Sequence, residues 1–107
     1  GSSIIHDGSP EASRVAKTLL RRVNADIEDA ALHFVELGPQ AKGSLARAVA
    51  EGSPARALIL ETTFKAQPLA LRVRQHRVMA ACFLRSQGML LDGISENTIA
   101  ARPVPDA

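Results

Sequence analysis

Two short apolar runs, with no convincing helix between them, most constrain how this chain can fold. The first, Ala31–Leu37, ends at Gly38-Pro39, and the second is Ala57–Thr62. Short aliphatic runs bounded by Gly or Pro predict β-strands. Parallel strands need a crossover of roughly a dozen residues or more, usually a helix. Because no helical pattern of that length separates the two runs, we expect them to pair antiparallel.

Helical patterns precede and follow these two strands. Ser9 and Pro10 supply a hydroxyl cap and a first-turn proline, and apolar residues then recur at helical spacing, so a helix is expected over residues 10–23. A second pattern, Val73–Leu84, is followed by the helix-stopping Gly88. Helices on one face of a small sheet are typical of an α+β fold.

The other segments complete a single-domain prediction. Residues 38–55 are either a long functional loop or a loop with one helical turn, and residues 94–101 are a weak third strand. The polar start, residues 1–9, predicts a disordered, mobile tail, and residues 104–107 predict another. A chain of 107 residues supports one core, here over residues 10–103. The expected order is α-β-β-α-α-β, a three-stranded mixed sheet with helices on one face.

Composition excludes several function classes. The chain has three Phe and no Trp or Tyr, so few aromatic faces are available for stacking single-stranded bases. A net charge of +2 is small for a nucleic-acid footprint. The single cysteine excludes an internal disulfide and indicates a reducing compartment. No apolar run approaches the roughly 18 residues that a membrane-spanning helix needs.

The sequence carries no recognisable catalytic motif. It contains no Gly-rich phosphate loop, no HExxH, no CxxC and no GxSxG. The Ser, His and Asp residues of positions 3–7 lie in the predicted tail, where nothing would hold them to catalytic tolerance. We therefore expect a non-catalytic protein.

The histidines and the cysteine receive different interpretations. His6 lies in the predicted tail and is expected to be solvated, whereas His33 is expected to be half-buried and bonded to a neighbour. His76 stands among arginines, whose charge lowers an imidazole pKa and favours the neutral, metal-ligating form. The alternative is that His76 only lines a basic helix end. Cys82 lies on a different helix face from His76, so we interpret it as a core residue.

Arginines surround His76 in the sequence. Arg72, Arg74 and Arg77 are candidates for contacting phosphate or an acidic partner, and Arg85 extends the same basic helix. A solvated helix face is an equally good interpretation of this cluster.

Two neighbouring segments resemble the signature of the BolA family. They are Phe64–Leu69, with the sequence FKAQPL, and Arg74–Met79, with the sequence RQHRVM. The family pattern is a strand ending in Phe, a short Gly-containing turn with a Leu, and an Arg-His-Arg-hydrophobic helix start. The resemblance extends over about residues 12–103.

The resemblance implies a fold, a partner and a cargo. BolA-like proteins have an α-β-β-α-α-β topology similar to a class II KH module. They bind monothiol glutaredoxins and take part in iron–sulfur maturation and iron regulation, and the motif histidine ligates a shared [2Fe–2S] cluster. His76 occupies that position here. A neutral imidazole that replaces a thiolate on iron removes negative charge and raises the reduction potential.

The chain departs from the family pattern at several positions. Three extra residues separate Phe64 from His76, Gln75 stands where an Arg is expected, and Ala66 stands where a Gly is expected. Residues 38–55, where the family supplies a second ligand, contain neither His nor Cys. A cluster bound to this protein would therefore need its other ligands from elsewhere.

Three functional hypotheses follow. The first is an adaptor that is monomeric alone and pairs with a monothiol glutaredoxin. The second is a DNA-binding transcriptional regulator that uses the basic helix 72–86, and the third is a structural subunit of a larger complex. A mitochondrial location is slightly favoured over a cytoplasmic one. Gly1-Ser2-Ser3 resembles an expression remnant, so a targeting segment would not be visible.

Overall fold

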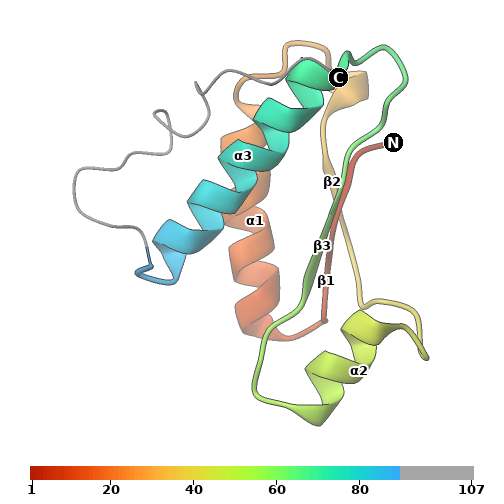
Figure 1. Cartoon of the computed structure of the whole chain (residues 1–107), viewed down its shortest axis with the longest axis vertical. Coiled ribbons are helices and arrows are strands. Elements are labelled where there is room, and N and C mark those ends of the chain that lie inside the picture. Colours follow the sequence, from red (N-terminus) through yellow and green to blue (C-terminus); the bar gives the residue numbers. More distant parts are fainter. Residues whose placement is uncertain (90–107) are drawn as a thin grey trace.

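The computed structural model describes residues 1–89, which form a mixed three-stranded sheet with helices packed against it (Figure 1). The strands are β1 (Ser3–His6), β2 (Val35–Leu37) and β3 (Leu58–Glu61). The helices are α1 (Pro10–Asn24), α2 (Leu45–Gly52) and α3 (Leu69–Ser86), with a short 3₁₀ helix η1 (Ala30–Leu32). The α+β class and the mixed three-stranded sheet are confirmed. The order over residues 1–89, β-α-β-α-β-α, differs from the predicted α-β-β-α-α-β.

Strand β1 lies at the centre of the sheet, so the prediction of a mobile tail over residues 1–9 is wrong. The strand order is β2-β1-β3, with β1 parallel to β2 and antiparallel to β3. The expected antiparallel pairing of the two apolar runs is also wrong, because β1 lies between them. Ile4 is completely buried, and even Ser2 and Ser3 are buried, so the first residues are part of the folded structure.

Helix α1 is the crossover that parallel strands require, but it joins β1 to β2. The Ser9 hydroxyl accepts a hydrogen bond from the Ala12 amide at 3.1 Å, which caps the helix as predicted. Leu19 on α1, Met79 on α3 and Ile4 on β1 are each 0% exposed and belong to one core cluster. Helices α1 and α3 therefore cover the same face of the sheet (Figure 1).

Segment 38–55 contains a two-turn helix, α2, rather than a single turn. Ser44 caps it by accepting from the Arg47 amide at 3.2 Å, and Arg47 pairs with Glu51 one turn later at 2.6 Å. Figure 1 shows α2 beyond the end of the sheet, away from α1 and α3. The helix links the two edge strands without covering the sheet.

Helix α3 begins at Leu69, directly after Pro68, and so starts earlier than the predicted Val73. It ends as expected at a glycine: Gly88 has a φ of +67°, and the Met89 amide donates to the Leu84 carbonyl at 2.8 Å. The predicted strand over 94–101 and the predicted tail over 104–107 lie outside the described residues.

A candidate binding pocket around His76

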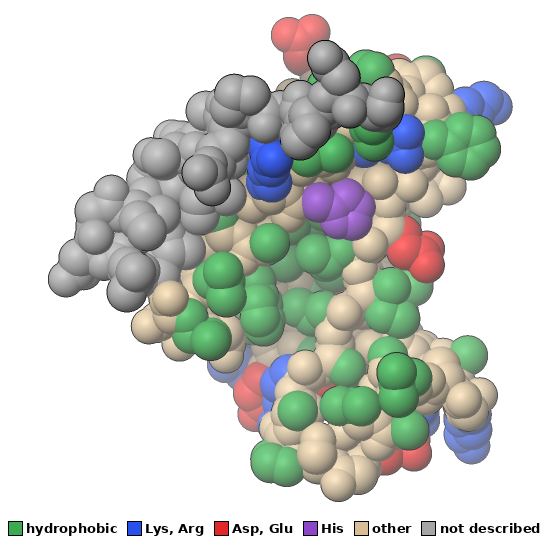
Figure 2. All heavy atoms as spheres, in the orientation of Figure 1, with side chains coloured by type: hydrophobic (Ala, Val, Ile, Leu, Met, Phe, Trp, Pro, Cys, Tyr) green, Lys and Arg blue, Asp and Glu red, His purple; other side chains and the backbone are tan. Residues whose placement is uncertain are grey.

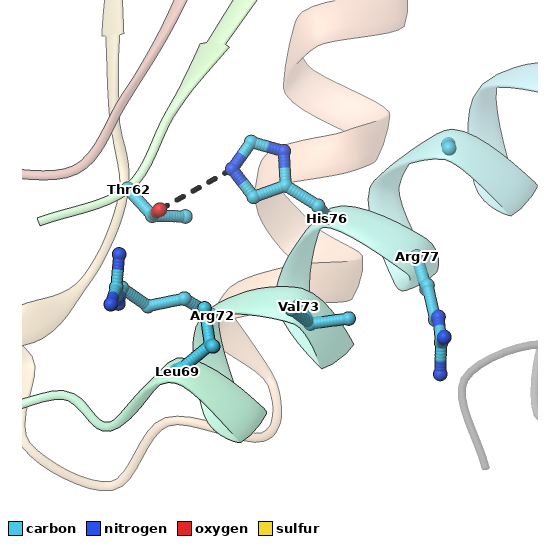
Figure 3. Close-up of a pocket in the computed structure, with 7 residues that line it drawn as sticks. Thr62, Leu69, Arg72, Val73, His76 and Arg77 are labelled. Carbon is cyan, nitrogen blue, oxygen red and sulfur yellow. Dashed lines mark hydrogen bonds between the residues drawn. The ribbon is translucent and has the colours of Figure 1, made fainter. Parts of the chain in front are cut away.

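His76 projects from the middle of α3 toward the loop that follows β3. Its Nε2 lies 3.3 Å from the Thr62 hydroxyl oxygen. The ring lines an open cavity of about 420 Å³, whose other walls include Leu69, Arg72 and Val73 (Figure 3). We call this cavity the His76 pocket. The sequence prediction that His76 lies on an accessible surface agrees with this position.

The protein environment favours the neutral form of the His76 imidazole. Burial lowers the pKa of His76 below its ordinary value of about 6.5 because a partly dehydrated site disfavours the charged ring. The direction matches the sequence expectation, but the cause is desolvation and not the charge of the neighbouring arginines. A neutral imidazole has one donor nitrogen and one acceptor nitrogen. If Nε2 donates to Thr62, the lone pair of Nδ1 is available to a ligand.

The three candidate arginines do not form one face. Arg72 extends to the Thr62 side of the pocket, whereas Arg77 points to the opposite side (Figure 3). Arg74 lies away from the pocket and contacts the Asp26 carboxylate at 3.3 Å. The hydrogen bonds from Arg22 and Arg74 hold the pKa of Asp26 below its ordinary range, although partial burial acts in the opposite direction. Arg72 and Arg77 thus line opposite sides of the His76 pocket, whereas Arg74 lies on another surface.

Arg72 carries an unsatisfied donor at the pocket. Its Nε is buried and has no hydrogen-bond partner among the described residues. An unpaired buried donor costs free energy. Because Arg72 lines the pocket, its guanidinium is a cationic group that an anion entering the pocket would meet.

A chain of buried amides fixes the loop that presents Thr62. The Gln75 amide donates to the Gln67 carbonyl oxygen at 2.8 Å, and the Gln67 amide donates to the Thr63 carbonyl at 2.8 Å. The Thr63 amide then donates to the Ser2 hydroxyl at 2.9 Å. Gln75 and Gln67 are only 3% and 4% exposed. A neutral amide suits this buried position, since a charge there would lose its water.

Cys82 and His33 occupy the positions expected from the sequence. Cys82 is 6% exposed and belongs to the core cluster. His33 is partly buried, and its Nε2 lies 2.7 Å from the Ile27 carbonyl oxygen. Within residues 1–89, no three or more His, Cys, Asp or Glu side chains gather in a metal-ligating arrangement.

His6 was expected to be solvated, and this prediction is wrong. The side chain is only 12% exposed, and its Nε2 lies 3.0 Å from the Glu36 carboxylate. Its Nδ1 accepts a hydrogen bond from the Gly8 amide at 3.0 Å, so Nε2 carries the proton and donates to Glu36. The signal that sequence reasoning missed is the β-branched pair Ile4-Ile5, which is short but favours a strand.

Glu36 is the centre of a polar cluster that joins β1, β2 and α1. Lys17 and Ser13 each donate to the same carboxylate oxygen at 3.0 Å. The hydrogen bond from Lys17, and then that from Ser13, holds the pKa of Glu36 below its ordinary range. This carboxylate oxygen is already hydrogen-bonded by the side chains of His6, Ser13 and Lys17. The cluster therefore connects β1, β2 and α1 structurally.

None of the helices in the described part of the chain is both long and apolar enough to cross a membrane. Comparison with known proteins gives no match to a family model, to a curated protein or to a solved structure. The BolA resemblance therefore rests on the residues of the two signature segments alone. The chemistry of the His76 pocket has to be argued from its own atoms.

Proposed function

We propose that this protein is a non-catalytic, BolA-like adaptor that presents His76 to an iron–sulfur cluster shared with a monothiol glutaredoxin. The observation that carries the proposal is a partly exposed imidazole, with a pKa that burial lowers, at an open pocket of about 420 Å³. Iron–sulfur centres accept neutral imidazole in place of thiolate. In this proposal the cluster is cargo, handed on or sensed at the pocket.

The Thr62 contact supports a ligand role for the imidazole. Metal-binding histidines commonly donate their second ring N–H to a protein oxygen, which fixes the tautomer and the ring orientation. The Thr62 hydroxyl, 3.3 Å from Nε2, is such an acceptor. The remaining nitrogen, Nδ1, then faces a partner with its lone pair.

The support comes from the pocket and not from the topology. The β-first order of the described residues differs from the α-β-β-α-α-β order that the resemblance implies. Since Cys82 is buried in the core, the other cluster ligands would have to come from the partner complex. The proposal therefore requires complex formation before the cluster is held.

Reconstitution tests this function directly. The full chain is mixed with a monothiol glutaredoxin, ferrous iron, sulfide and glutathione, and the visible absorption and circular dichroism are recorded. We expect a heterodimer whose spectrum differs from that of the glutaredoxin alone. His76→Ala should abolish the difference, while His33→Gln should preserve it. An unchanged spectrum with His76→Ala would overturn ligation by His76.

The DNA-binding alternative has less support from the site. Helix α3 contains the arginines of the basic segment 72–86, but Arg74 is paired with Asp26 and the side chains of Arg72 and Arg77 diverge. A regulator that used this helix would lose DNA affinity steeply with salt. Affinity of that kind, lost on charge reversal of Arg77, would favour the alternative.

A further inference from the structure

A second hollow continues the His76 pocket along α3. It has a volume of about 300 Å³ and is lined by Leu58 and Leu60 of β3 and by Phe83 and Leu84 of α3. Ala80 lines both hollows, so together they form a groove between β3 and α3. Figure 2 shows hydrophobic side chains gathered in the hollow between these two elements. We call this feature the β3–α3 groove.

The strand that borders this groove has an open edge. Within the described residues, β3 pairs with β1 on one side and with no strand on the other. Every second residue of an edge strand directs its N–H and C=O groups away from the sheet. Such an edge is a template for one further strand.

The groove has a cationic group at each end. Arg72 lies at the Thr62 end with its buried, unpartnered Nε, and Arg56 lines the hollow at the Leu58 end. Arg56 lies 3.7 Å from the Glu11 carboxylate, and its charge also helps to lower the pKa of Asp7. Between the two ends the walls are mainly apolar. An occupant that matches these walls is apolar along its length and acidic where it meets Arg72.

We propose that the β3–α3 groove binds an extended, acidic segment of a partner protein, which adds as a strand to the open edge of β3. Alternate side chains of the added strand enter the groove, and the others face away from it. A carboxylate of the segment pairs with Arg72, and an apolar residue fills the hollow beside Phe83. This docking does not depend on metal ligation by His76, and it supplies an attachment for whichever partner meets that histidine.

Charge argues against a second copy of this chain as the occupant. Two copies related by a two-fold axis through paired β3 edges would bring Arg56 of one molecule toward Arg72 of the other. Like charges placed opposite each other are destabilising. Glu61 does not relieve this repulsion, since it shares the other face of the sheet with Ser3, whose hydroxyl lies 3.5 Å away. An acidic strand from a different protein would meet the positive charge at both ends of the groove without this repulsion.

The proposal is tested by peptide display. Peptides of about ten residues that bind the full chain are selected from a random library. We expect enrichment of alternating apolar residues with an acid. Binding of an enriched peptide should slow hydrogen exchange at alternate amides of Leu58–Glu61. Methylating the backbone nitrogens of the peptide that face β3, or replacing its acid with Lys, should weaken binding by about tenfold or more.

Matched variants of the protein locate the binding site. Ala80→Glu places a carboxylate in the exposed wall that both hollows share, and we expect loss of binding. Ala48→Glu, at an exposed position of α2, makes the same change away from the groove and should leave binding unchanged. Arg72→Gln should remove the preference for the acidic peptide over its Lys counterpart, whereas loss of metal ligation alone would leave peptide binding intact.

Several results would overturn the proposal. One is a library that yields no enriched peptide, and another is binding that backbone methylation does not affect. If the β3 amides that face away from β1 are already protected in the free monomer, the edge is occupied by this chain itself. If their protection appears only as the concentration of the free protein rises, the occupant is a second copy.

Discussion

At the residue scale, two histidines show how strongly surroundings decide the role of one side chain. Partial burial lowers the pKa of His76, which faces an open pocket, whereas His6 is enclosed and donates to Glu36. His6 follows two isoleucines in the sequence, whereas His76 stands among arginines. Only the positions of Thr62 and Glu36 in space separate a candidate ligand from a structural connector.

His76 should titrate below its ordinary pKa of about 6.5 in the folded protein. The unfolded chain then binds more protons as the pH falls through that value, so the free energy of unfolding decreases with falling pH until the folded pKa is passed. His76→Gln should remove this part of the pH dependence. NMR titration of the ring protons and denaturant unfolding between pH 5 and 8 measure the two effects. A midpoint at or above the ordinary value would contradict the desolvation argument.

Gly38 is required by a close approach to His6. A Cβ at this position would lie 2.7 Å from the His6 carbonyl oxygen and 2.9 Å from its Nδ1. Because the nearer atom belongs to the backbone of the central strand, it cannot move cheaply. We expect Gly38→Ala to lower the free energy of unfolding by about 1–3 kcal/mol. Gly52→Ala, where an added Cβ meets no atom within 4 Å, is the control and should change stability little.

At the element scale, the loop after β3 is the part of the site that most needs support. It joins β3 to α3 and carries Thr62, and its position depends on buried amides that reach from α3 back to Ser2. A single glutamine in a sequence does not by itself indicate a buried hydrogen-bond network. Their partners come from segments far apart in the chain, so this network has no local pattern.

The Gln75–Gln67 pair should show coupling in a double-mutant cycle. Gln67→Leu leaves the Gln75 amide buried without its acceptor, and we expect a loss of about 1–3 kcal/mol in the free energy of unfolding. The double variant, with Leu at both positions, should lose less than the sum of the two single variants, because no donor is then left unpaired. Chemical denaturation of the four proteins gives the coupling energy. Strict additivity would mean that the 2.8 Å contact contributes nothing.

At the scale of the whole molecule, the first residues of the chain determine the sheet. β1 contacts both other strands and lies beneath α1, so it is the element through which the two edge strands are held together. An α+β domain of this size has a thin core, and the loss of one central strand removes a large share of it.

Ile4→Ala should test this central position. Ile4 is 0% exposed, so its truncation leaves a cavity, and we expect a loss of about 2–5 kcal/mol in the free energy of unfolding. Ile5→Ala, one residue along on the opposite face and only half-buried, should cost clearly less. A mobile tail would make both substitutions neutral. Thermal and denaturant unfolding distinguish these outcomes.

The sequence by itself determined the elements whose signals are local. The cap at Ser9, the glycine stop after α3 and the two apolar runs gave helix and strand positions, and the α+β class followed from them. His76, Cys82 and His33 were also placed in surroundings of the expected kind. The first apolar run is shorter as a strand than predicted, because Ala30–Leu32 forms a 3₁₀ turn that Asp29 caps.

Only the tertiary structure decided which strands are neighbours and which side chains meet. Pairing is set by hydrogen bonds between segments distant in sequence, so a four-residue strand at the start could displace the expected hairpin. The same holds for the site: three arginines close together in the sequence diverge in space, while Thr62 reaches His76 from another element. Local periodicity sets secondary structure, but the burial of a shared core selects the arrangement.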